Sequence, residues 1–433
     1  MLYNSQNRFL VELMEGSVFM SELFEKARRV REAWEVLKTS NAQAKNEAIM
    51  RIAEKLDEER KNILEANEKD VKSARERGVK ESLIDRLLLN EKRIDSMIES
   101  CAIVAKLKDP VGEVIDSWVR EDGLRISRIR VPIGPIGVVY ESRPNVTVET
   151  TVLAIKSGNT ILLRGGSDAI NSNRAIVSAI KKALMESSIP ESSVEFIENP
   201  DRALVGEMLK LEDYLSLIVP RGGYQLIEYV RKNATVPVLE TGVGNCHIYV
   251  DESADQDKAI PVIINAKVQR PGTCNAAEKL LVHEKIARSF IPKVVEALRN
   301  HGVEVRGCEK TQKIVNVLPA TEEDWETEYL DLIIGIKVVR DIDEAIEHIK
   351  RYSTGHSEAI ITENYTSARK FVESIDAAAV YVNASTRFTD GGEFGFGAEI
   401  GISTQRLHAR GPVGLRELTT YKYVVLGDYH VRS

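Results

Sequence analysis

Hydrophobic residues follow a helical repeat in the first quarter of the chain. Up to about residue 108 the sequence is highly charged and carries a single apolar stripe. Four apolar residues recur there at the spacing of one helix face, namely Ile49, Ile52, Ala53 and Leu56. The preceding run Ser40-Asn41-Ala42-Gln43 resembles a capping box. This part therefore predicts helices whose role is packing.

Short apolar runs replace the helical repeat after residue 121. Asp122-Gly123 precedes an imperfect alternation over residues 124–131, which predicts an exposed hairpin. Two series of β-rich runs then alternate with helical stretches: residues 136–140, 160–163, 194–197 and 215–219, and later residues 278–282, 335–339, 358–362 and 378–383. This order predicts an α/β protein built from βαβ units with mostly parallel sheets. The β-rich residues 421–426 are expected to pair with the hairpin or with another subunit.

Two of the predicted strands end in glycine-rich turns. The strand at 160–163 leads into Arg164-Gly165-Gly166-Ser167, and the strand at 215–219 leads into Pro220-Arg221-Gly222-Gly223. Each turn opens a predicted helix, where backbone N–H groups approach a phosphate and the helix dipole favours an anion. Together the turns favour a dinucleotide site, although the usual Gly-x-Gly-x-x-Gly fingerprint is absent. The missing Walker A pattern counts against an ATPase or a kinase.

The composition limits the partners and the compartment. A chain of 433 residues is too long for one small core and predicts two or three domains. With 43% hydrophobic and 29% charged residues and a net charge of -7, it lacks the basic footprint that binds nucleic acid. No apolar run reaches the roughly 18 residues of a membrane helix, and the N-terminus makes a poor signal peptide. We expect a cytoplasmic protein with an N-terminal extension at residues 1–19, translated from Met1 or Met20.

The four cysteines separate into one candidate nucleophile and three packing residues. No Cys-x-x-Cys pair accompanies them, so neither a metal site nor a disulfide framework is expected. Cys101, Cys246 and Cys308 are interpreted as small buried hydrophobes. Cys274 lies in the turn Gln269-Arg270-Pro271-Gly272-Thr273-Cys274-Asn275, just before the apolar residues 280–282. We interpret it as a nucleophile at a strand's start, with Glu240 as a partner 274 − 240 = 34 positions earlier.

The order and spacing of these motifs resemble the aldehyde dehydrogenase superfamily. The matching motifs are Pro132-Ile133-Gly134-Pro135-Ile136-Gly137-Val138-Val139, Asn145, Gly158-Asn159-Thr160, Glu240, Cys274 and Phe394-Gly395. Within it, the chain is similar to the γ-glutamyl phosphate reductases of proline biosynthesis. That similarity rests on Asp109-Pro110-Val111-Gly112, Tyr140-Glu141-Ser142-Arg143-Pro144-Asn145-Val146-Thr147, Lys156-Ser157-Gly158-Asn159, Leu163-Arg164-Gly165-Gly166 and the Cys274 turn. It extends over about residues 20–427.

The resemblance implies an architecture and a reaction. A dinucleotide-binding domain would comprise residues 20–121 and 138–246, and a catalytic thiol domain residues 247–408. Residues 122–137 and 412–428 would form a β-flap that joins subunits into a homodimer or homotetramer. The implied reaction is the NADPH-dependent reduction of L-glutamate 5-phosphate to L-glutamate 5-semialdehyde, with release of phosphate. Pathway logic adds the glutamate 5-kinase that makes this substrate as a candidate partner.

The implied chemistry suits the catalytic candidates. An acyl phosphate is an activated carboxyl derivative, and a thiolate is the side chain best suited to attack it. By resemblance, the Asn145 amide and the Cys274 backbone N–H hold the oxyanion. Glu240 matches the base of the oxidising relatives, which activates water that a reductase has to exclude. Glu240 is therefore either a helper that deprotonates Cys274 or a polar residue at a strand end.

The resemblance also assigns the cofactor contacts. They are Lys156, Arg164, Gly165, Gly166, Ser167, Arg221, Gly222, Gly223 and Glu328. Oxidising relatives carry a glutamate where this chain has Ser167, and that glutamate holds a ribose 2′-hydroxyl. Losing the carboxylate and gaining Arg164 favours a 2′-phosphate and hence NADP(H), partly offset by Asp168. The family's Phe two positions after Glu328 is Leu330 here, which makes the role of Glu328 less secure.

Cations near the thiol are candidates for binding the anionic groups of the substrate. Arg143-Pro144 replaces a Pro-Trp pair of the oxidising relatives, which suits a small anionic substrate. Arg270 and His356 are further candidates, and each of the three is also explicable as a surface or ion-pair residue. Two alternatives stay open: an oxidising or CoA-acylating aldehyde dehydrogenase, and a nucleotide-binding relative without activity. Phosphate release tests the first, and substrate protection of the thiol against alkylation tests the second.

Overall fold

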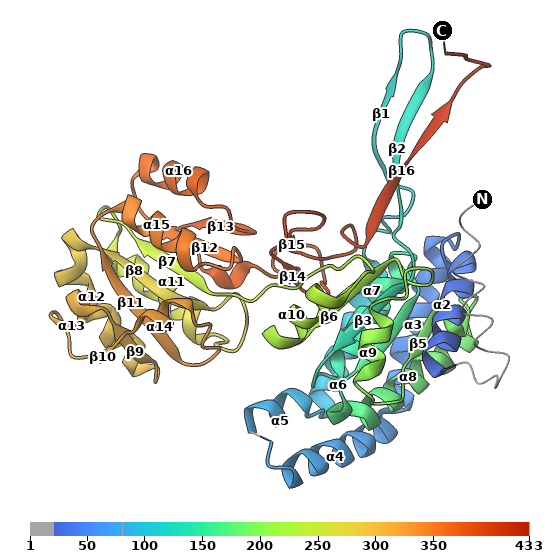
Figure 1. The fold of residues 1–433 in the computed structure, drawn as a ribbon, viewed down its shortest axis with the longest axis horizontal. Helices are drawn as coiled ribbons and strands as arrows, with labels where there is room; N and C mark the ends of the chain where they lie inside the picture. Colours follow the sequence, from blue (N-terminus) through green and yellow to red (C-terminus); the bar gives the residue numbers. More distant parts are fainter. Residues whose placement is uncertain (1–20, 80, 433) are drawn as a thin grey trace. The chain divides into compact units, whose positions relative to one another are not determined.

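A computed structural model describes residues 21–79 and 81–432 of the protein. The predicted extension at residues 1–19 and the start at Met20 lie outside the described residues. The chain divides into two units (Figure 1). The first contains the described residues up to 105, residues 132–218 and residues 233–237. The second contains residues 106–131, 219–232 and 238–432.

The first unit is rich in helices, as its apolar stripe predicts. Its helices are α2 (Glu22–Leu37), α3 (Ala42–Glu58), α4 (Arg60–Glu76), α5 (Glu81–Leu87), α6 (Glu91–Lys106), α7 (Asn145–Lys156), α8 (Ile170–Met185) and α9 (Ala203–Met208), with the 3₁₀ turns η1 (Ser167–Ala169) and η2 (Glu191–Ser193). The capping box predicted at Ser40 is wrong. Asn41 caps α3 by accepting from the Ala44 amide at 2.9 Å, whereas the Ser40 hydroxyl donates to the preceding helix at Val36.

A four-stranded sheet forms the core of the first unit. Its strands are β3 (Ile136–Tyr140), β4 (Ile161–Gly165), β5 (Val194–Phe196) and β6 (Leu217–Arg221), in the order β5-β4-β3-β6. The β3–β4 and β4–β5 pairs are parallel, and all residues of β3, β4 and β5 are buried. All four predicted strands are confirmed, with ends shifted by no more than two residues. Continuous apolar runs are typical of parallel strands that are covered on both faces.

The second unit contains a larger sheet in the order β10-β9-β11-β8-β7-β12-β13. Its strands are β7 (Cys246–Val250), β8 (Ala277–His283), β9 (Glu304–Gly307), β10 (Leu318–Pro319), β11 (Ile333–Val339), β12 (Ser357–Ile361) and β13 (Ala379–Val382), and every adjacent pair is parallel. The accompanying helices are α10 (Tyr224–Asn233), α11 (Gln256–Val268), α12 (Glu284–Asn300), α13 (Glu309–Gln312), α14 (Glu322–Glu326), α15 (Ile342–Tyr352), α16 (Tyr365–Ser374) and η3 (Thr386–Phe388). The four strands predicted in this region are confirmed.

Alternate residues of the central strands bury opposite faces of this sheet. Ile248 and Leu280 pack with residues of α11 and α12, whereas Tyr249 and Leu281 pack with residues of α15 and α16 (Figure 1). Side chains of a strand alternate between the two faces, so this sheet requires helices on both sides. The resulting core fixes the register of β7, β8 and β12.

That register brings distant segments to one edge of the sheet. β7, β8 and β12 are parallel neighbours and begin at Cys246, Ala277 and Ser357. Their amino ends therefore lie together, and so do the segments that enter them, residues 240–245, 269–276 and 353–356. These three segments contain most of the candidate catalytic residues.

A separate three-stranded sheet joins the predicted hairpin to the end of the chain. It has the order β1-β2-β16, formed by β1 (Val114–Val119), β2 (Arg125–Pro132) and β16 (Thr419–Leu426), and the β1–β2 pair is antiparallel. The predicted hairpin at residues 124–131 is wrong, because this stretch forms the single strand β2, and its antiparallel partner is β1. The C-terminal strand pairs with β2, which confirms that it joins this part of the chain. β1 was not predicted, and most of its residues are exposed. A short sheet of β14 (Ile402–Ser403) and β15 (Gly411–Pro412) lies between β13 and β16 in sequence.

Among the described residues, none of the helices is both long and apolar enough to cross a membrane.

A buried charged pair lies beside the thiol-bearing strand. Lys267 Nζ donates to Glu278 Oε2 at 3.0 Å, and neither side chain is exposed. Burial lowers the pKa of Lys267 and raises the pKa of Glu278 to about 7, while each partner opposes the shift of the other. The pair connects the end of α11 to the second residue of β8, so it helps to fix the turn between them.

Breaking this pair should destabilise the second unit. We expect Lys267→Met to lower the free energy of unfolding by about 3–5 kcal/mol, because a buried carboxyl loses its partner. The double variant Lys267→Met with Glu278→Leu should recover most of that loss. Urea denaturation followed by circular dichroism measures both. Single-variant losses under about 1 kcal/mol would contradict a structural role for the pair.

Candidate active site

The turn that enters β8 presents Cys274 at the amino edge of the large sheet. Cys274 is half-buried. The turn is held from within, because the Ala276 amide donates to the Thr273 carbonyl at 3.0 Å and the Thr273 hydroxyl donates to Asn275 Oδ1 at 2.9 Å. The position of Cys274 on a loop at a strand's start agrees with the interpretation of the sequence. Such a fixed turn aims the thiol in one direction.

His356 is the side chain that meets the thiol. Its Nε2 lies 3.1 Å from Cys274 Sγ, although the two residues are 82 positions apart. His356 immediately precedes β12, and its imidazole is fully buried. The sequence placed His356 among the residues for substrate anions. The structure instead places it as a hydrogen-bond partner of the thiol, because β12 and β8 both flank β7 and begin at the same edge.

A chain of hydroxyl groups continues from the far side of the imidazole. His356 Nδ1 lies 2.8 Å from Ser357 Oγ, and Ser357 Oγ lies 2.6 Å from Thr389 Oγ1. Thr389 Oγ1 in turn lies 2.7 Å from the Tyr381 hydroxyl. His356, Ser357 and Thr389 are all fully buried. A partner at Nδ1 orients the ring and sets which nitrogen carries the proton, as in other histidine-based sites.

Both reacting groups are uncharged at rest. Burial raises the pKa of the Cys274 thiol to about 11, and the charge of Arg221 opposes this shift. Burial also lowers the pKa of His356 to about 4. The nearby side chains of Glu328, Glu358 and Glu399 act in the opposite direction and raise that pKa. At neutral pH the thiol is therefore protonated and the imidazole is neutral. A neutral imidazole nitrogen 3.1 Å away can accept the thiol proton.

The backbone of Cys274 rests on the segment that enters β7. A Cβ at Gly244 would overlap the Cys274 carbonyl oxygen, so only glycine allows this approach. The Gly244 amide donates to Glu328 Oε1 at 2.7 Å. Cys246 Sγ donates to the Cys274 carbonyl at 3.2 Å. Cys246 was interpreted as a packing residue, and it is buried as expected, but it also contacts the backbone of the thiol turn.

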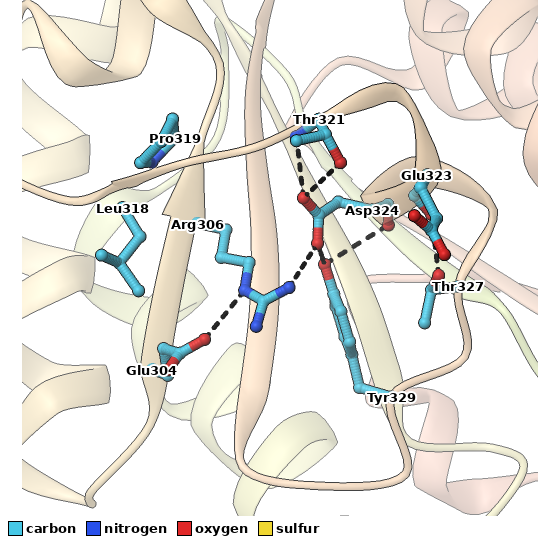
Figure 2. A pocket seen from close by; sticks show the side chains of 9 residues that line it. All are labelled: Glu304, Arg306, Leu318, Pro319, Thr321, Glu323, Asp324, Thr327 and Tyr329. Carbon is cyan, nitrogen blue, oxygen red and sulfur yellow. Dashed lines mark hydrogen bonds and ion pairs between the residues drawn. The ribbon is translucent and has the colours of Figure 1, made fainter.

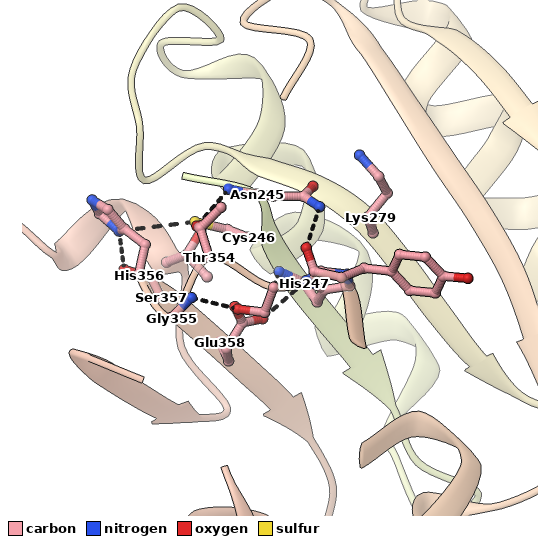
Figure 3. Close-up of polar contacts among 12 residues, drawn as sticks. Asn245, Cys246, His247, Lys279, Thr354, Gly355, His356, Ser357 and Glu358 are labelled. Atoms are coloured by element: carbon pink, nitrogen blue, oxygen red, sulfur yellow. Dashed lines mark hydrogen bonds and ion pairs between the residues drawn. The ribbon is translucent and has the colours of Figure 1, made fainter. Parts of the chain in front are cut away.

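A buried polar layer lies behind this contact (Figure 3). The Asn245 side chain donates to the carbonyls of Trp325 and Tyr352, each at 2.8 Å. Glu358 accepts from the His247 amide at 2.8 Å and from the Ser353 hydroxyl. Burial raises the pKa of Glu358 to about 8 and lowers the pKa of His247 to about 3, so both are uncharged at neutral pH. This layer ties β7, β12 and the segment before β11 together behind the thiol.

In the described part of the chain, Glu240 makes no contact with the Cys274 thiol. Its backbone amide donates to Gln405 Oε1 at 2.9 Å. Burial raises the pKa of its carboxyl, and the charges that act on it come from Arg231 and Glu228. The charges that act on Cys274 come instead from Arg221, Glu328 and Glu399. Glu399 was missed in the sequence because it lies 125 positions (399 − 274) beyond the thiol, with no local motif.

Two arginines flank the thiol turn. Arg270 begins it and is exposed. Arg387, which the sequence did not single out, donates from Nε to Gln269 Oε1 at 2.7 Å and from Nη1 to Asn275 Oδ1. Its guanidinium therefore spans the two ends of the turn. Only the position of Asn275 beside Cys274 could have pointed to such a partner.

Arg164 and Lys156, two of the residues expected to contact the cofactor, form hydrogen bonds within the first unit. Arg164 donates to the carbonyls of Gly165 at 2.7 Å, Pro200 at 2.7 Å and Asp201 at 3.2 Å, and the residue is 6% exposed. Lys156 is 1% exposed and donates to Asn46 and to the Ala105 carbonyl, among other contacts. Each long side chain satisfies buried backbone carbonyls in this structure. The expected contacts of both residues with the cofactor stay predictions.

The first glycine-rich turn keeps an open face. A Cβ at Gly165 would overlap Asn173 Nδ2. That amide nitrogen has no hydrogen-bond partner among the described residues. Ser167 is exposed, and the Asp168 carboxylate accepts from the Ser142 hydroxyl. The turn then enters η1 and α8, so it lies at a helix start. A phosphate suits such a place.

The remaining predicted residues lie as follows. Arg143 is half-buried, and Asn145 is the first residue of α7, where its amide donates to Glu149 Oε1 at 2.9 Å. In the second unit, Gly222 and Gly223 are exposed just before α10. Arg221 lies close to Gly401, whose Cβ would come within 3.1 Å of its Nη1. Arg221 was expected to bind cofactor, and it also acts on the thiol through its charge.

A hollow of about 490 Å³ lies elsewhere in the second unit (Figure 2). Its central Arg306 is already paired with Glu304 at 2.8 Å and with Asp324 at 2.7 Å. The Tyr329 hydroxyl donates to the same Asp324 carboxylate at 2.8 Å. The side chains that line it include none of the predicted site residues. Its lining carries the carboxylates of Glu304, Glu323 and Asp324 against the single guanidinium of Arg306, so it is a poor candidate for an anionic substrate.

The described residues contain no cluster of side chains suited to a metal ion, and all four cysteines are free thiols. Cys101 is buried, as interpreted. Cys308 is only half-buried, and its sulfur accepts from the Val338 amide at 3.4 Å. It is thus more exposed than the sequence suggested.

The raised thiol pKa predicts how Cys274 is alkylated. The rate with iodoacetamide should rise about tenfold per pH unit from pH 7 to pH 10 without a plateau, because only the thiolate reacts and its fraction is small below a pKa of about 11. Arg221→Gln should slow the reaction across this range by raising the pKa further. Mass spectrometry of the Cys274 peptide follows the rate.

Arg340→Gln is the matched control for the loss of one positive charge. Arg340 follows the carboxyl end of β11, which runs parallel to β8, so it lies at the opposite edge from the thiol. Its variant should alkylate at the wild-type rate. A plateau near pH 8 in the wild type would show that the resting thiol is not held protonated.

Comparisons with known proteins agree with the motif resemblance. The family model "Aldehyde dehydrogenase family" matches residues 19–312 and 313–424. The chain is 78% identical to the gamma-glutamyl phosphate reductase of Thermotoga petrophila over 415 residues, which are 96% of this chain and 100% of the relative. It is 65% identical to the enzyme of the same name from Kosmotoga olearia over 413 residues, 95% of this chain and 100% of the relative.

Solved structures give the same result. The crystal structure of gamma-glutamyl phosphate reductase from Thermotoga maritima matches with a TM-score of 0.94 and 78% identity, covering 95% of this chain and 100% of that one. An acetylating aldehyde dehydrogenase from Geobacillus thermoglucosidasius, 17% identical over 95% of this chain and 98% of its own, shares the fold with a TM-score of 0.69. The expected α/β fold and the motif resemblance are confirmed. The chain belongs to the aldehyde dehydrogenase family and, within it, to the gamma-glutamyl phosphate reductases.

Proposed function

We propose that the protein catalyses the NADPH-dependent reduction of L-glutamate 5-phosphate to L-glutamate 5-semialdehyde, with release of phosphate, in proline biosynthesis. The observation that carries this proposal is the 3.1 Å contact between His356 Nε2 and Cys274 Sγ. It supplies a nucleophile with its proton acceptor in a chain 78% identical to named reductases.

The first half of the reaction uses the side chains around the thiol. His356 Nε2 accepts the Cys274 proton as the sulfur attacks the acyl carbon. The new C–S bond forms as the carbonyl π electrons move onto oxygen, which gives a tetrahedral oxyanion. When this oxyanion collapses, the C–O bond to phosphate breaks and its bonding electrons leave with the phosphate. The His356 pKa of about 4 makes the imidazolium a strong acid, so the proton is readily returned to a later anion. We assign the Asn145 amide and the Cys274 N–H to the oxyanion on the basis of the family resemblance.

The second half begins from the thioester on Cys274. NADPH, when bound, supplies the hydride that reduces the thioester carbon. Collapse of the resulting tetrahedral species breaks the C–S bond and returns the sulfur as a thiolate, which the imidazolium of His356 can protonate. In the described part of the chain, Glu240 makes no hydrogen bond to the thiol. This suits the proposed course, because Glu240 matches the residue that activates water in the oxidising relatives.

Support for NADPH over NADH comes from the open turn after β4. Ser167 is exposed where a carboxylate would select a ribose hydroxyl, and the nearby Asp168 carboxylate is engaged by Ser142. The positive charge near the turn is Arg202, which is exposed and acts on Arg164. Arg164 itself faces backbone carbonyls, so we transfer the proposed contact with a 2′-phosphate to Arg202.

The assembly and its setting are also proposals. We infer a homodimer or homotetramer joined through the β1-β2-β16 sheet, whose two outer strands expose Trp118, Val119, Tyr423 and Val425. The four free thiols suit a reducing compartment, which supports a cytoplasmic location. Glutamate 5-kinase remains the candidate partner, because an acyl phosphate hydrolyses when it is left in water.

Running the reaction backward tests the proposed activity. Wild-type protein with semialdehyde and NADP should form NADPH only when phosphate or arsenate is present. Cys274→Ser should lower this rate by more than about 10³-fold, because the hydroxyl is a far weaker nucleophile at this site. Absorbance at the NADPH band reports both. Formation of NADPH with CoA in place of phosphate, or undiminished activity of Cys274→Ser, would refute the proposal.

The cofactor preference has its own test. We expect kcat/KM to be higher with NADPH than with NADH in the wild type. Ser167→Glu should reverse the order, because a carboxylate repels the 2′-phosphate and accepts from a 2′-hydroxyl. Arg202→Gln should weaken NADPH binding with little effect on NADH. Equal efficiencies with both cofactors in the wild type would contradict the preference.

A further inference from the structure

Arg387 is anchored at the thiol turn by neutral groups. Its Nε donates to Gln269 Oε1 at 2.7 Å, and its Nη1 donates to Asn275 Oδ1. Both acceptors are amide oxygens, so the guanidinium is fixed in position without being neutralised. The Asn275 amide nitrogen completes the link by donating to the Thr389 carbonyl at 3.0 Å. This arrangement holds a forked cation within one residue of Cys274.

The charge of Arg387 has no ion-pair partner within the described part of the chain. Its Nη2 has no hydrogen-bond acceptor there either. The nearest candidate, Asp390, uses its carboxylate to accept from the amides of Gly392 and Glu393, at 2.9 and 3.3 Å. Burial and the charge of Arg270 lower the pKa of Arg387, which shows a partly desolvated cation beside a second one. The charges of Asp390 and Glu393 act in the opposite direction, although neither forms an ion pair with Arg387 in the described part of the chain. An anion placed between the two arginines would therefore be favourable.

We propose that Arg387 and Arg270 form the subsite that binds the phosphate group of the substrate as it leaves the acyl carbon. This inference rests on the proposed function and assigns a residue that the sequence did not identify. The guanidinium fork matches phosphate oxygens, and its free Nη2 provides donors for them. Arg270, exposed at the opposite end of the turn, supplies the second positive charge.

The location suits phosphate better than the distant carboxylate of the substrate. The phosphate is bonded to the carbon that the sulfur attacks, and Arg387 is bonded to the residue next to Cys274. After the sulfur has added to the acyl carbon, the tetrahedral oxyanion collapses, the C–O bond to phosphate breaks and its electron pair goes to the departing phosphate. A cation fixed at this point stabilises that charge as it develops, which lowers the barrier and not merely the substrate KM.

Phosphate and semialdehyde are separate substrates in the backward reaction, so it tests the subsite directly. In Arg387→Gln the KM for phosphate should rise about 10- to 100-fold, as for loss of a charge-assisted hydrogen bond. The KM for semialdehyde should stay within about twofold, and Arg270→Gln should show a smaller rise for phosphate. A second readout is cofactor-free: inorganic phosphate should protect Cys274 from iodoacetamide, with the half-protecting concentration raised by the same factor.

Three further variants serve as controls for the Arg387→Gln experiment. Arg340→Gln removes the same charge at the opposite sheet edge and should leave both KM values unchanged. Gln269→Leu removes one anchor of the guanidinium and should raise the phosphate KM even if Arg387→Gln does not fold. Arg387→Lys keeps the charge but not the fork, so it should recover only part of the affinity.

The outcomes separate the two proposals. A phosphate-dependent wild type whose Arg387 variants keep a normal phosphate KM would overturn the subsite alone. A rise in the semialdehyde KM without a change for phosphate would also overturn it, by showing that Arg387 binds the carboxylate. A wild type that oxidises semialdehyde without phosphate would overturn the proposed function and the subsite with it.

Discussion

The contact between an uncharged imidazole and an uncharged thiol is the interaction on which the candidate site depends. It requires β8 and β12 to start at the same edge, one strand apart, and it requires the Cys274 turn to lie close to the segment that enters β7. Gly244 allows that approach, and Glu328 holds Gly244 by its amide. The hydroxyl chain behind His356 then leaves the ring one orientation. Removing any of these supports would separate two atoms that have to exchange a proton.

The location of this contact departs from the common arrangement of α/β proteins, in which ligands bind beyond the carboxyl ends of parallel strands. In the second unit, Cys274, Arg270 and His356 lie on segments that enter strands at the amino edge of the sheet. Arg387 lies on the segment after β13. The segments that enter these strands are held by buried side chains, such as Asn245 just before β7 and Glu358 within β12. The site therefore rests on segments that buried hydrogen bonds tie to the sheet. The glycine turn after β4 follows the common arrangement within its own unit.

The sequence predicts the strands well and the site only in part. β3 is an apolar run buried on both faces, and β8 and β12 contain short apolar runs at residues 280–282 and 359–361, so composition identifies these strands. β1 has no such signal because most of its residues face solvent. Cys274 was found because proline, glycine and threonine mark its turn. The pairing of His356 with Cys274, and of Arg387 with Asn275, depends on strand order, which no local motif encodes. The contacts of Arg164 with backbone carbonyls could not be predicted either, because a motif gives a residue's place but not the direction of its side chain.

The buried setting of Cys274 also has a consequence for the lifetime of the enzyme in a cell. Peroxides and other oxidants attack thiolates far faster than thiols, and a pKa of about 11 leaves almost no thiolate at rest. Desolvation of the Cys274 thiol thus protects it from oxidation and also keeps it protonated until the reaction begins. The sulfur becomes reactive only when its proton passes to His356 during turnover. A reactive cysteine of this kind can remain reduced between substrates without a second thiol dedicated to its repair.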